Sequence, residues 1–395
     1  MSSVVRVLAI ALVVSAAVFS AVTPLAQTAP PRLIAVGDIH GALDSLVSIL
    51  RTTGLIDEQN RWIGGRARLV QTGDFLDRGP SDREVMELLM RLEEEAKRAG
   101  GRVEVLFGNH EGMNILHDFR DVSPDAYRTF ADANSESRRT KGFTTHATMA
   151  RRSGRELNRN DWLRDHPPGF IEYAEAMGPT SKFGRWLRAR KVVAKIDDSV
   201  FMHAGIPLQS SSSIDDINRA VQREVRSFDD AVSMLQSTGV IPPFFTLQEV
   251  LAAAPAELNR LAASLREGQE PQQDLTQDAV GRLQRLLGIR QWTLVDPDGP
   301  LWFRGYAMLA PDAQPQIEAV LKRLGAARFV VGHTPQLPGR ITPRFENRVF
   351  LIDTGMLTTV YRGGRPSALE IAGDRITAVY TDERQELQTP DAVRR

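Results

Sequence analysis

The sequence predicts an α/β fold in which helices flank β-sheets, and three features lead to that prediction. Apolar runs and helical patterns alternate over residues 32–108, in the order strand, helix, strand, helix, strand. Each apolar run stops at a glycine that polar residues follow, which is where open α/β sheets place their binding sites. Apolar residues make up 42% and charged residues 25% of the 395 residues. Because these are ordinary globular values, the composition excludes disordered, collagen-like and coiled-coil classes.

Three strands and two helices are expected within residues 32–108. The strands fall at residues 33–36, 69–71 and 103–107, and the helices fall at residues 43–50 and 83–98. Pro80 and Ser81, with Glu84 three positions after Ser81, form a capping-box pattern at the start of the second helix. The βαβαβ order implies a mostly parallel sheet with right-handed crossovers.

Two long segments show helical patterns. Residues 112–190 are polar and rich in Arg and Asp, with no strand pattern, so we expect a helical insertion that lies over the site. Residues 213–290 form a second helical region, with an amphipathic stretch over 247–265 and a polar loop over 268–273.

The rest of the chain predicts strands. Residues 191–196 and 200–203 flank an Asp-Asp pair and predict a β-hairpin. A strand over 329–331 ends at Gly332, and the last 45 residues predict a β-meander. The domain is therefore expected to span residues 32–381, with a flexible tail over 382–395.

The N-terminus predicts a targeting segment. Arg6 precedes an apolar or small run over residues 7–22, which is shorter than the roughly 20 residues that span a bilayer. We expect residues 1–26 to be a signal peptide of an exported, periplasmic or secreted protein, although no cleavage site is clearly defined. An uncleaved N-terminal membrane anchor is the alternative.

Charge and cysteine content exclude several kinds of partner and site. Lys plus Arg and Asp plus Glu both number 49, so the net charge is zero and no nucleic-acid partner is expected. The absence of cysteine removes disulfides, thiolate catalysis and Cys-ligated metals. Any metal must therefore be held by histidine and by carboxylate or amide oxygen.

Five polar clusters follow predicted strands, and they contain four of the seven histidines. The clusters are residues 37–41 (Gly-Asp-Ile-His-Gly), 73–79 (Gly-Asp-Phe-Leu-Asp-Arg-Gly), 108–111 (Gly-Asn-His-Glu), 203–205 (His-Ala-Gly) and 332–334 (Gly-His-Thr). The other three histidines, His117, His146 and His166, are expected to be ordinary surface or cap residues.

The residue types in these clusters predict a two-metal site. Asp38 and His40 are two positions apart on an extended segment, so they point to the same side. Asp74 follows the neighbouring strand, and its two carboxylate oxygens can bridge two ions. Neutral ligands for the second ion are Asn109, His203 and His333. Oxygen and nitrogen ligands suit Mn²⁺, Fe or Zn²⁺, and we expect Mn²⁺.

The remaining polar residues predict hydrolysis of a phosphate ester. Two metals about 3.5–4 Å apart clamp a phosphoryl group and generate a hydroxide nucleophile at neutral pH. Arg78 can fork onto the phosphate oxygens, and Asn109 is a further expected substrate contact. His110 directly follows Asn109 and reaches the leaving-group side. With Asp77 orienting it, His110 can donate the proton.

Each cluster alone has an ordinary structural explanation. An isolated Asp-x-His pair is usually a turn or a surface pair, and an isolated Gly-His-Thr usually marks a strand end. Residues 74–78 could be a salt-bridge cluster at a helix start. The occurrence of all five clusters, each after a predicted strand, favours the metal site.

Together the clusters resemble the signature of the metallophosphoesterase superfamily, specifically its phosphoprotein phosphatase branch, from about Leu33 to Ile371. The resemblance implies a calcineurin-like sandwich of two mixed β-sheets between helices, with two metals at the sheet edge. It implies metal one on Asp38, His40 and Asp74, and metal two on Asp74, Asn109, His203 and His333. It also implies that Arg78 binds phosphate and that His110 with Asp77 acts as the general acid.

Two later segments resemble the bacterial Shewanella-like phosphatases. Residues 351–356 (Leu-Ile-Asp-Thr-Gly-Met) stand where the eukaryotic Ser/Thr phosphatases carry an aromatic Asn-Tyr loop. Residues 299–305 contain a Trp-x-Arg element that resembles the family's second phosphate-binding arginine, so Arg304 is the candidate. A buried structural salt bridge is the alternative for Arg304. Preference between phosphoserine/threonine and phosphotyrosine stays open.

We therefore expect an exported two-metal phosphomonoesterase that acts on phosphoproteins or small phosphoesters. The rival enzyme is a symmetrical dinucleoside tetraphosphatase, which shares the motifs and a late Asp-Thr-Gly segment. Export argues against that rival because dinucleoside polyphosphates are cytosolic. A non-catalytic binding module of the same fold is expected to lose His110, Asp77 or Arg78, and all three are present.

Overall fold

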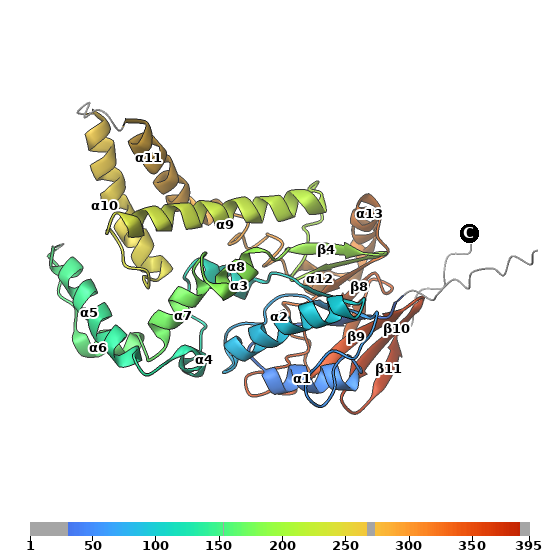
Figure 1. Cartoon of the computed structure of the whole chain (residues 1–395). Coiled ribbons are helices and arrows are strands. Elements are labelled where there is room, and N and C mark those ends of the chain that lie inside the picture. The colour runs from blue at the N-terminus through green and yellow to red at the C-terminus, as the bar shows by residue number, and fades with distance from the viewer. Residues whose placement is uncertain (1–30, 153, 267–272, 388–395) are drawn as a thin grey trace, which may run out of the picture. The chain divides into compact units, whose positions relative to one another are not determined.

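The protein is described by a computed structural model over residues 31–152, 154–266 and 273–387. The described strands form two sheets, drawn as arrows in Figure 1. A six-stranded sheet has the order β11-β10-β9-β1-β2-β3, and a five-stranded sheet has the order β4-β5-β6-β8-β7. The predicted fold class, two mixed sheets flanked by helices, is confirmed. The predicted signal peptide lies outside the described residues.

The first sheet contains the three strands predicted at the start of the domain. β1 (Leu33–Val36), β2 (Arg68–Gln71) and β3 (Arg102–Val105) pair in parallel. Helices α1 (Leu43–Thr52) and α2 (Asp82–Arg98) connect them. The predicted βαβαβ order is therefore confirmed.

The start of α2 differs from the prediction. The Ser81 side chain makes no capping hydrogen bond, so the predicted capping box with Glu84 is wrong. The backbone N–H of Asp77 instead donates to the Asp82 carboxylate over 3.0 Å. The first residue of α2 therefore fixes the loop that follows β2.

The C-terminal strands complete the first sheet as a meander. β9 (Ser367–Ala372) pairs antiparallel with β1, β10 (Arg375–Tyr380) pairs with β9, and β11 (Arg384–Leu387) pairs with β10. The meander was predicted, but the flexible tail from residue 382 is wrong for residues 384–387. Leu387 is buried in the core, which anchors this last strand.

The second sheet begins with the predicted hairpin. β4 (Val193–Ile196) and β5 (Ser199–Met202) pair antiparallel. β6 (Arg328–Val331) and β8 (Val349–Leu351) continue the sheet in parallel, and β7 (Thr342–Arg344) pairs antiparallel with β8.

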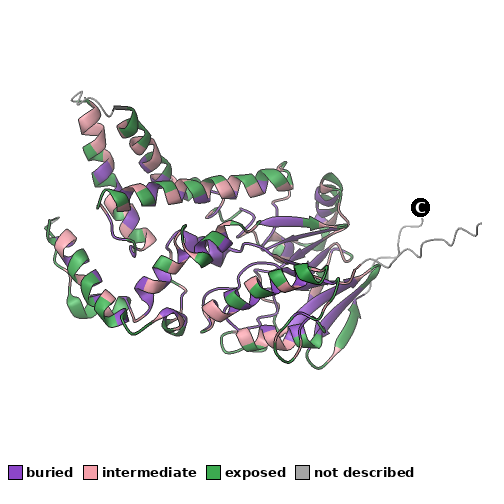
Figure 2. Ribbon diagram, viewed as in Figure 1, coloured by how far each residue is buried: buried purple, intermediate pink, exposed green. Residues whose placement is uncertain are grey.

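Alternation along the strands divides the apolar side chains between two cores. Leu33 and Ala35 of β1 share a cluster with Phe201 of the second sheet. Ile34 and Val36 belong to the larger cluster that the helices cover. Successive side chains of a strand point to opposite faces, so β1 contributes to both cores. Figure 2 shows buried strands and exposed outer helix faces.

The described residues between 112 and 190 form helices and no strand, as expected for an insertion. The helices here are α3 (Asn109–Ile115), α4 (Pro124–Phe130), α5 (Ser135–Arg152), α6 (Arg159–Asp165), α7 (Phe170–Met177) and α8 (Lys182–Arg188). His117, His146 and His166 are buried, so none of them is a surface residue, although His166 is the C-cap residue of α6, which agrees with the prediction of a cap residue. They pack among aromatic rings; the ring centroids of His166 and Trp162, for example, are 4.0 Å apart.

A second helical region follows the hairpin, as predicted. It contains α9 (Ile214–Ser237), α10 (Leu247–Arg266) and α11 (Gln273–Leu287). The later helical elements are η1 (Ile289–Gln291), α12 (Gly305–Met308), η2 (Pro311–Ala313) and α13 (Gln314–Leu324). Helices α10 and α11 pack side by side, and α11 also contacts α9 (Figure 1). None of the described helices is both long and apolar enough to cross a membrane.

The packing of α11 predicts a large difference between two leucines of that helix. Leu286 is 0% exposed and Leu275 is 70% exposed. Leu286→Ala should lower the free energy of unfolding by about 2–5 kcal/mol because it leaves a cavity. Leu275→Ala, the matched control, should change it by less than about 0.5 kcal/mol. Urea denaturation measures both, and equal losses would contradict this packing.

Candidate active site

The predicted site residues meet at the carboxyl ends of parallel strands from both sheets. Asp38 and His40 follow β1, Asp74 follows β2, Asn109 and His110 begin α3 after β3, His203 follows β5, and His333 follows β6. Their exposed fractions are 5% or less. The two sheets therefore bring together side chains that are nearly 300 positions apart in the chain.

The Asp74 carboxylate lies at the centre of this cluster. Its Oδ2 is 3.2 Å from Nε2 of His203 and 3.9 Å from Nε2 of His40. Nε2 of His203 also lies 2.8 Å from Oδ1 of Asn109 and 2.9 Å from Nδ1 of His333. Atoms that commonly act as metal ligands therefore converge from five residues.

Each of the three histidines contacts a backbone carbonyl through one ring nitrogen. His40 Nδ1 lies 3.0 Å from the oxygen of Leu76, His203 Nδ1 lies 3.3 Å from that of Thr72, and His333 Nε2 lies 3.1 Å from that of Trp302. A carbonyl only accepts, so these nitrogens carry the hydrogen and the other nitrogen presents a lone pair. Burial lowers the pKa of His40 to about 3, which keeps its ring neutral.

This arrangement fits divalent cations. Several acceptor atoms face one another here without enough N–H donors to form hydrogen bonds at every contact. They are the lone pairs of His203 and His333, the Asn109 oxygen and the Asp74 carboxylate. A cation removes that repulsion, and nitrogen and oxygen donors suit first-row divalent metals. Two groups could each hold an ion, namely His40 with Asp74 and His110, and Asp74 with His203 and His333.

Asp38 lies beside the first group rather than within it. Its Oδ2 is 3.9 Å from Nε2 of His40, and its carboxylate accepts hydrogen bonds from the backbone N–H of His333 at 3.0 and 3.1 Å. Burial and the charges of Asp353 and Asp74 raise the pKa of Asp38 well above its ordinary value. A neighbouring cation would stabilise the charged form of this carboxyl group.

The loops that carry these side chains have an unusual backbone. His40, Asp74, Asp77, Arg78 and His333 all have φ between 50° and 69°, a left-handed region that costs energy for residues with a side chain. Their neighbouring glycines allow close approach. A Cβ at position 108 would lie 2.3 Å from Oδ1 of Asp74, and one at position 332 would lie 2.2 Å from Oδ1 of Asp38.

His110 and Asp77 form a buried pair with Nδ1 and Oδ2 2.6 Å apart. The other oxygen of Asp77 accepts from Asn114 over 2.8 Å, and the Tyr173 hydroxyl donates to Asn114 over 2.8 Å. Burial lowers the pKa of His110, but the charges of Asp74 and Asp77 outweigh it and raise that pKa to about 9. The imidazole is therefore protonated at neutral pH.

Three arginines, Arg78, Arg120 and Arg304, line the cavity of about 440 Å³ that opens onto these residues. Arg78 Nη1 lies 2.8 Å from Nε2 of His40 and also donates to the hydroxyl of Tyr361. Arg304 Nη1 donates to the carbonyl oxygen of His333 over 2.9 Å. Arg304 is exposed, so the alternative of a buried salt bridge is wrong for this residue.

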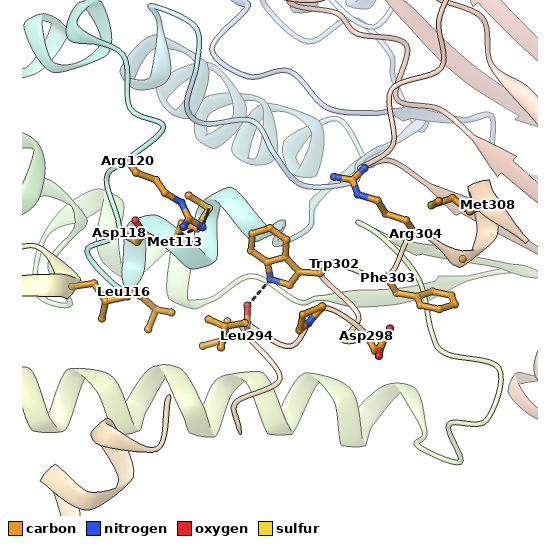
Figure 3. A pocket seen from close by; sticks show the side chains of 14 residues that line it. Met113, Leu116, Asp118, Arg120, Leu294, Asp298, Trp302, Phe303, Arg304 and Met308 are labelled. Carbon is orange, nitrogen blue, oxygen red and sulfur yellow. Dashed lines mark hydrogen bonds and ion pairs between the residues drawn. The ribbon is translucent and has the colours of Figure 1, made fainter. Parts of the chain in front are cut away.

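A second cavity of about 650 Å³ adjoins the first. Met113, Arg120, Trp302 and Arg304 line both cavities. Figure 3 shows Trp302 between Arg304 and Met113, with its indole N–H directed at the carbonyl oxygen of Leu294, 2.9 Å away. The polar cavity therefore continues into an apolar recess.

Three residues of the site had no role in the sequence prediction. The Glu111 carboxylate accepts from four backbone N–H groups, those of Asp74, Phe75, Leu76 and Gly108, at 2.8–3.2 Å. Its place three residues after Gly108, as in a capping box, was the available signal. Asp353 lies in the quoted Asp-Thr-Gly segment, where burial raises its pKa to about 6. No sequence motif contains Tyr361 or identifies it as a residue of the site.

Comparison with known proteins gives consistent matches. The profile of the calcineurin-like phosphoesterases matches residues 31–237. Shewanella-like protein phosphatase 2 of Arabidopsis thaliana is 33% identical over 208 residues, which is 50% of this chain and 53% of the relative. Shewanella-like protein phosphatase 1 of Plasmodium berghei is 25% identical over 354 residues, 88% of this chain and 74% of the relative.

A solved structure shares the fold. The cold-active protein-tyrosine phosphatase of a psychrophilic Shewanella species aligns over 91% of this chain and 80% of its own, with a TM-score of 0.58. Its sequence identity is 23%, so this likeness concerns the fold alone.

The contact between Gly332 and Asp38 predicts a specific loss of metal binding. Gly332→Ala should displace the Asp38 carboxylate, because the added Cβ would lie 2.2 Å from Oδ1. We expect a loss of at least tenfold in Mn²⁺ affinity by calorimetric titration. Gly281→Ala, in α11 away from the site, is the control and should keep wild-type affinity. Unchanged affinity in Gly332→Ala would contradict a metal role for Asp38.

Proposed function

The chain belongs to the calcineurin-like phosphoesterase family, and on that basis we propose that it is a metal-dependent phosphatase of phosphoproteins. One observation carries the proposal: Arg78, His110 and Arg304 line a single cavity together with Asp74. This cavity combines cationic groups, a protonated imidazole and residues able to hold metals. The two relatives named as protein phosphatases support a protein substrate.

Two divalent ions are proposed as cofactors, and Mn²⁺ is the expected metal. One ion would be held by Asp38, His40 and Asp74, and the other by Asp74, Asn109, His203 and His333. When bound, such ions supply positive charge that activates water and polarises phosphoryl oxygens. Nε2 of His110 lies 3.8 Å from Oδ2 of Asp74, near where the first ion would be held, but a protonated ring has no lone pair at Nε2 for a metal. We therefore assign His110 to proton transfer instead.

His110 is proposed as the general acid. Its Nδ1 is held by Asp77, so Nε2 carries the proton that can move to the leaving-group oxygen. Asn114 and Tyr173 fix Asp77 in turn. The pair is therefore oriented by hydrogen bonds that reach into the helical insertion.

Arg78 and Arg304 are proposed to bind the phosphate. Both are cationic, and both line the cavity beside Asn109, the third proposed substrate contact. A guanidinium can donate two parallel hydrogen bonds to phosphate oxygens. The adjoining apolar recess leaves room for the part of the substrate that carries the ester.

Export to the periplasm or the cell exterior is proposed from the sequence of the N-terminus. Arg6 and the apolar run over residues 7–22 support it. A membrane contact is proposed only if this segment is not removed.

A substrate panel tests the proposed function. Phosphoserine, phosphothreonine and phosphotyrosine peptides of one sequence are compared with diadenosine tetraphosphate, in Mn²⁺ and after chelation. We expect phosphate release from at least one peptide, and loss of that activity on chelation that Mn²⁺ restores. Symmetrical cleavage of the tetraphosphate without peptide hydrolysis would support the rival enzyme. Full activity in metal-free protein would contradict the metal sites.

If His110 is the general acid, its substitution should slow the hydrolysis of two substrates to different extents. His110→Asn should slow phosphoserine hydrolysis by about 10²–10⁴-fold, because an alkoxide leaving group needs a proton. Hydrolysis of p-nitrophenyl phosphate should fall much less, because nitrophenolate is a stable anion. Arg78→Ala and Arg304→Ala should slow both substrates alike, because they act on the shared phosphoryl group. Equal losses for both substrates in metal-loaded His110→Asn would rule out the general acid role.

The N-terminal proposal predicts the start of the mature chain. Mass spectrometry of protein from the cell envelope fraction should show a chain that begins between about residue 18 and residue 31, as signal cleavage requires. An intact N-terminus in the membrane fraction would indicate an anchor. An intact N-terminus in a soluble cytosolic pool would overturn export.

A further inference from the structure

Tyr361 lies beside the Arg78 guanidinium at the cavity. The hydroxyl of Tyr361 accepts a hydrogen bond from Nη1 of Arg78. The ring centroid of Tyr361 is 6.0 Å from that of His40. Arg78 and Tyr361 both line the cavity of about 440 Å³, although they are 283 positions apart in the chain.

Nε2 of His40 cannot accept a hydrogen bond from Arg78 and coordinate a metal at the same time. That nitrogen has one lone pair, because Nδ1 carries the hydrogen toward the carbonyl oxygen of Leu76. When the lone pair is given to a metal, Nη1 of Arg78 loses the partner that lies 2.8 Å away. The Tyr361 hydroxyl is then its remaining side-chain acceptor, since the Asp121 carboxylate faces Nη2 at 3.9 Å.

The loop that carries Tyr361 is built tightly enough to hold its side chain. A Cβ at Gly355 would lie 2.7 Å from Cβ of Tyr361. The backbone N–H of Tyr361 donates to Leu357 over 2.9 Å, and its carbonyl accepts from Gly364 over 3.0 Å. Ser45 of α1 donates to the carbonyl of Met356 over 3.0 Å and so ties the same loop to that helix. The ring is therefore placed by backbone contacts on both sides.

We propose that Tyr361 is a positioning residue for phosphate recognition, whose hydroxyl holds the Arg78 guanidinium in place once His40 is bound to metal. This inference rests on the proposed function and names a residue that the motifs do not contain. Arg78 starts from a left-handed backbone with φ of 67°. Its long side chain would otherwise sample many rotamers, and fixing it reduces the entropy lost on binding.

The test compares two tyrosine hydroxyls in the full-length, Mn²⁺-loaded protein. Tyr361→Phe keeps the ring and removes only the acceptor for Arg78. Tyr380→Phe is the matched control, because the buried hydroxyl of Tyr380 accepts from the backbone N–H of Ile341 over 2.9 Å, away from the site. Calorimetry measures the dissociation constant of inorganic phosphate and that of Mn²⁺, and kinetics use p-nitrophenyl phosphate.

We expect Tyr361→Phe to weaken phosphate binding by about 10- to 100-fold, as for loss of a hydrogen bond to a charged group. KM should rise by a similar factor, kcat should change less, and the Mn²⁺ affinity should stay at the wild-type value. Tyr380→Phe should lower the midpoint of thermal unfolding and leave phosphate binding unchanged. Equal phosphate affinity in Tyr361→Phe and wild type would overturn the proposal.

A double variant tests whether Tyr361 acts through Arg78. In an Arg78→Lys background, which lacks the guanidinium fork, adding Tyr361→Phe should cause no further loss of phosphate affinity. Additive losses would show that Tyr361 does not act through Arg78 and would contradict the proposal. A wild-type protein that neither binds phosphate nor hydrolyses phosphate esters would instead refute the proposed function itself.

Discussion

Asp74 holds a carboxylate in the interior of the protein, and the site is organised around stabilising that charge. Burial alone would raise its pKa, and the protonated ring of His110, whose Nε2 lies 3.8 Å from Oδ2, opposes that effect. An uncompensated buried charge costs several kcal/mol, so the residues around it are under tight constraint. The backbone N–H of His110 donates to Oδ1 over 3.0 Å, and Glu111 fixes the Asp74 backbone.

The sequence predicted the strands, and it placed the proposed metal ligands directly after them, because both patterns depend on local order. A short apolar run that ends at glycine fixes where β1, β2 and β6 stop, and parallel pairing brings the following residues together. Packing between residues that are distant in the sequence is not marked by any local pattern of this kind. The burial of the insertion histidines was not predicted, because some of their aromatic partners are distant in the sequence, such as Phe228 for His117. Tyr361 was missed for the same reason.

The helical insertion contacts the proposed site through side-chain hydrogen bonds that reach Asp77. The Tyr173 hydroxyl on α7 donates to Asn114 and lies 3.3 Å from the Asp82 carboxylate. Asp82 in turn accepts from the backbone N–H of Asp77. Two hydrogen-bonded routes therefore lead from one buried insertion residue to the partner of His110. A pattern search for motifs finds the Asp77 and His110 pair, but the residue that fixes its geometry lies outside every motif.

The charges around the cavity affect how a phosphate can bind there. Asp38, Asp74 and Asp353 are all buried, and Asp74 forms part of the cavity wall. Burial, together with repulsion by Asp353 and Asp74, raises the pKa of Asp38. A phosphate dianion brought to this wall meets carboxylates, while the cationic side chains Arg78 and Arg304 stand further out on the lining. Arg120 and the protonated ring of His110 also line the cavity, but so does Asp121, and the buried carboxylate of Asp74 repels a dianion in a medium of low dielectric constant. We therefore expect divalent cations held by these residues to favour phosphate binding, because their positive charge would offset that of the buried carboxylate groups.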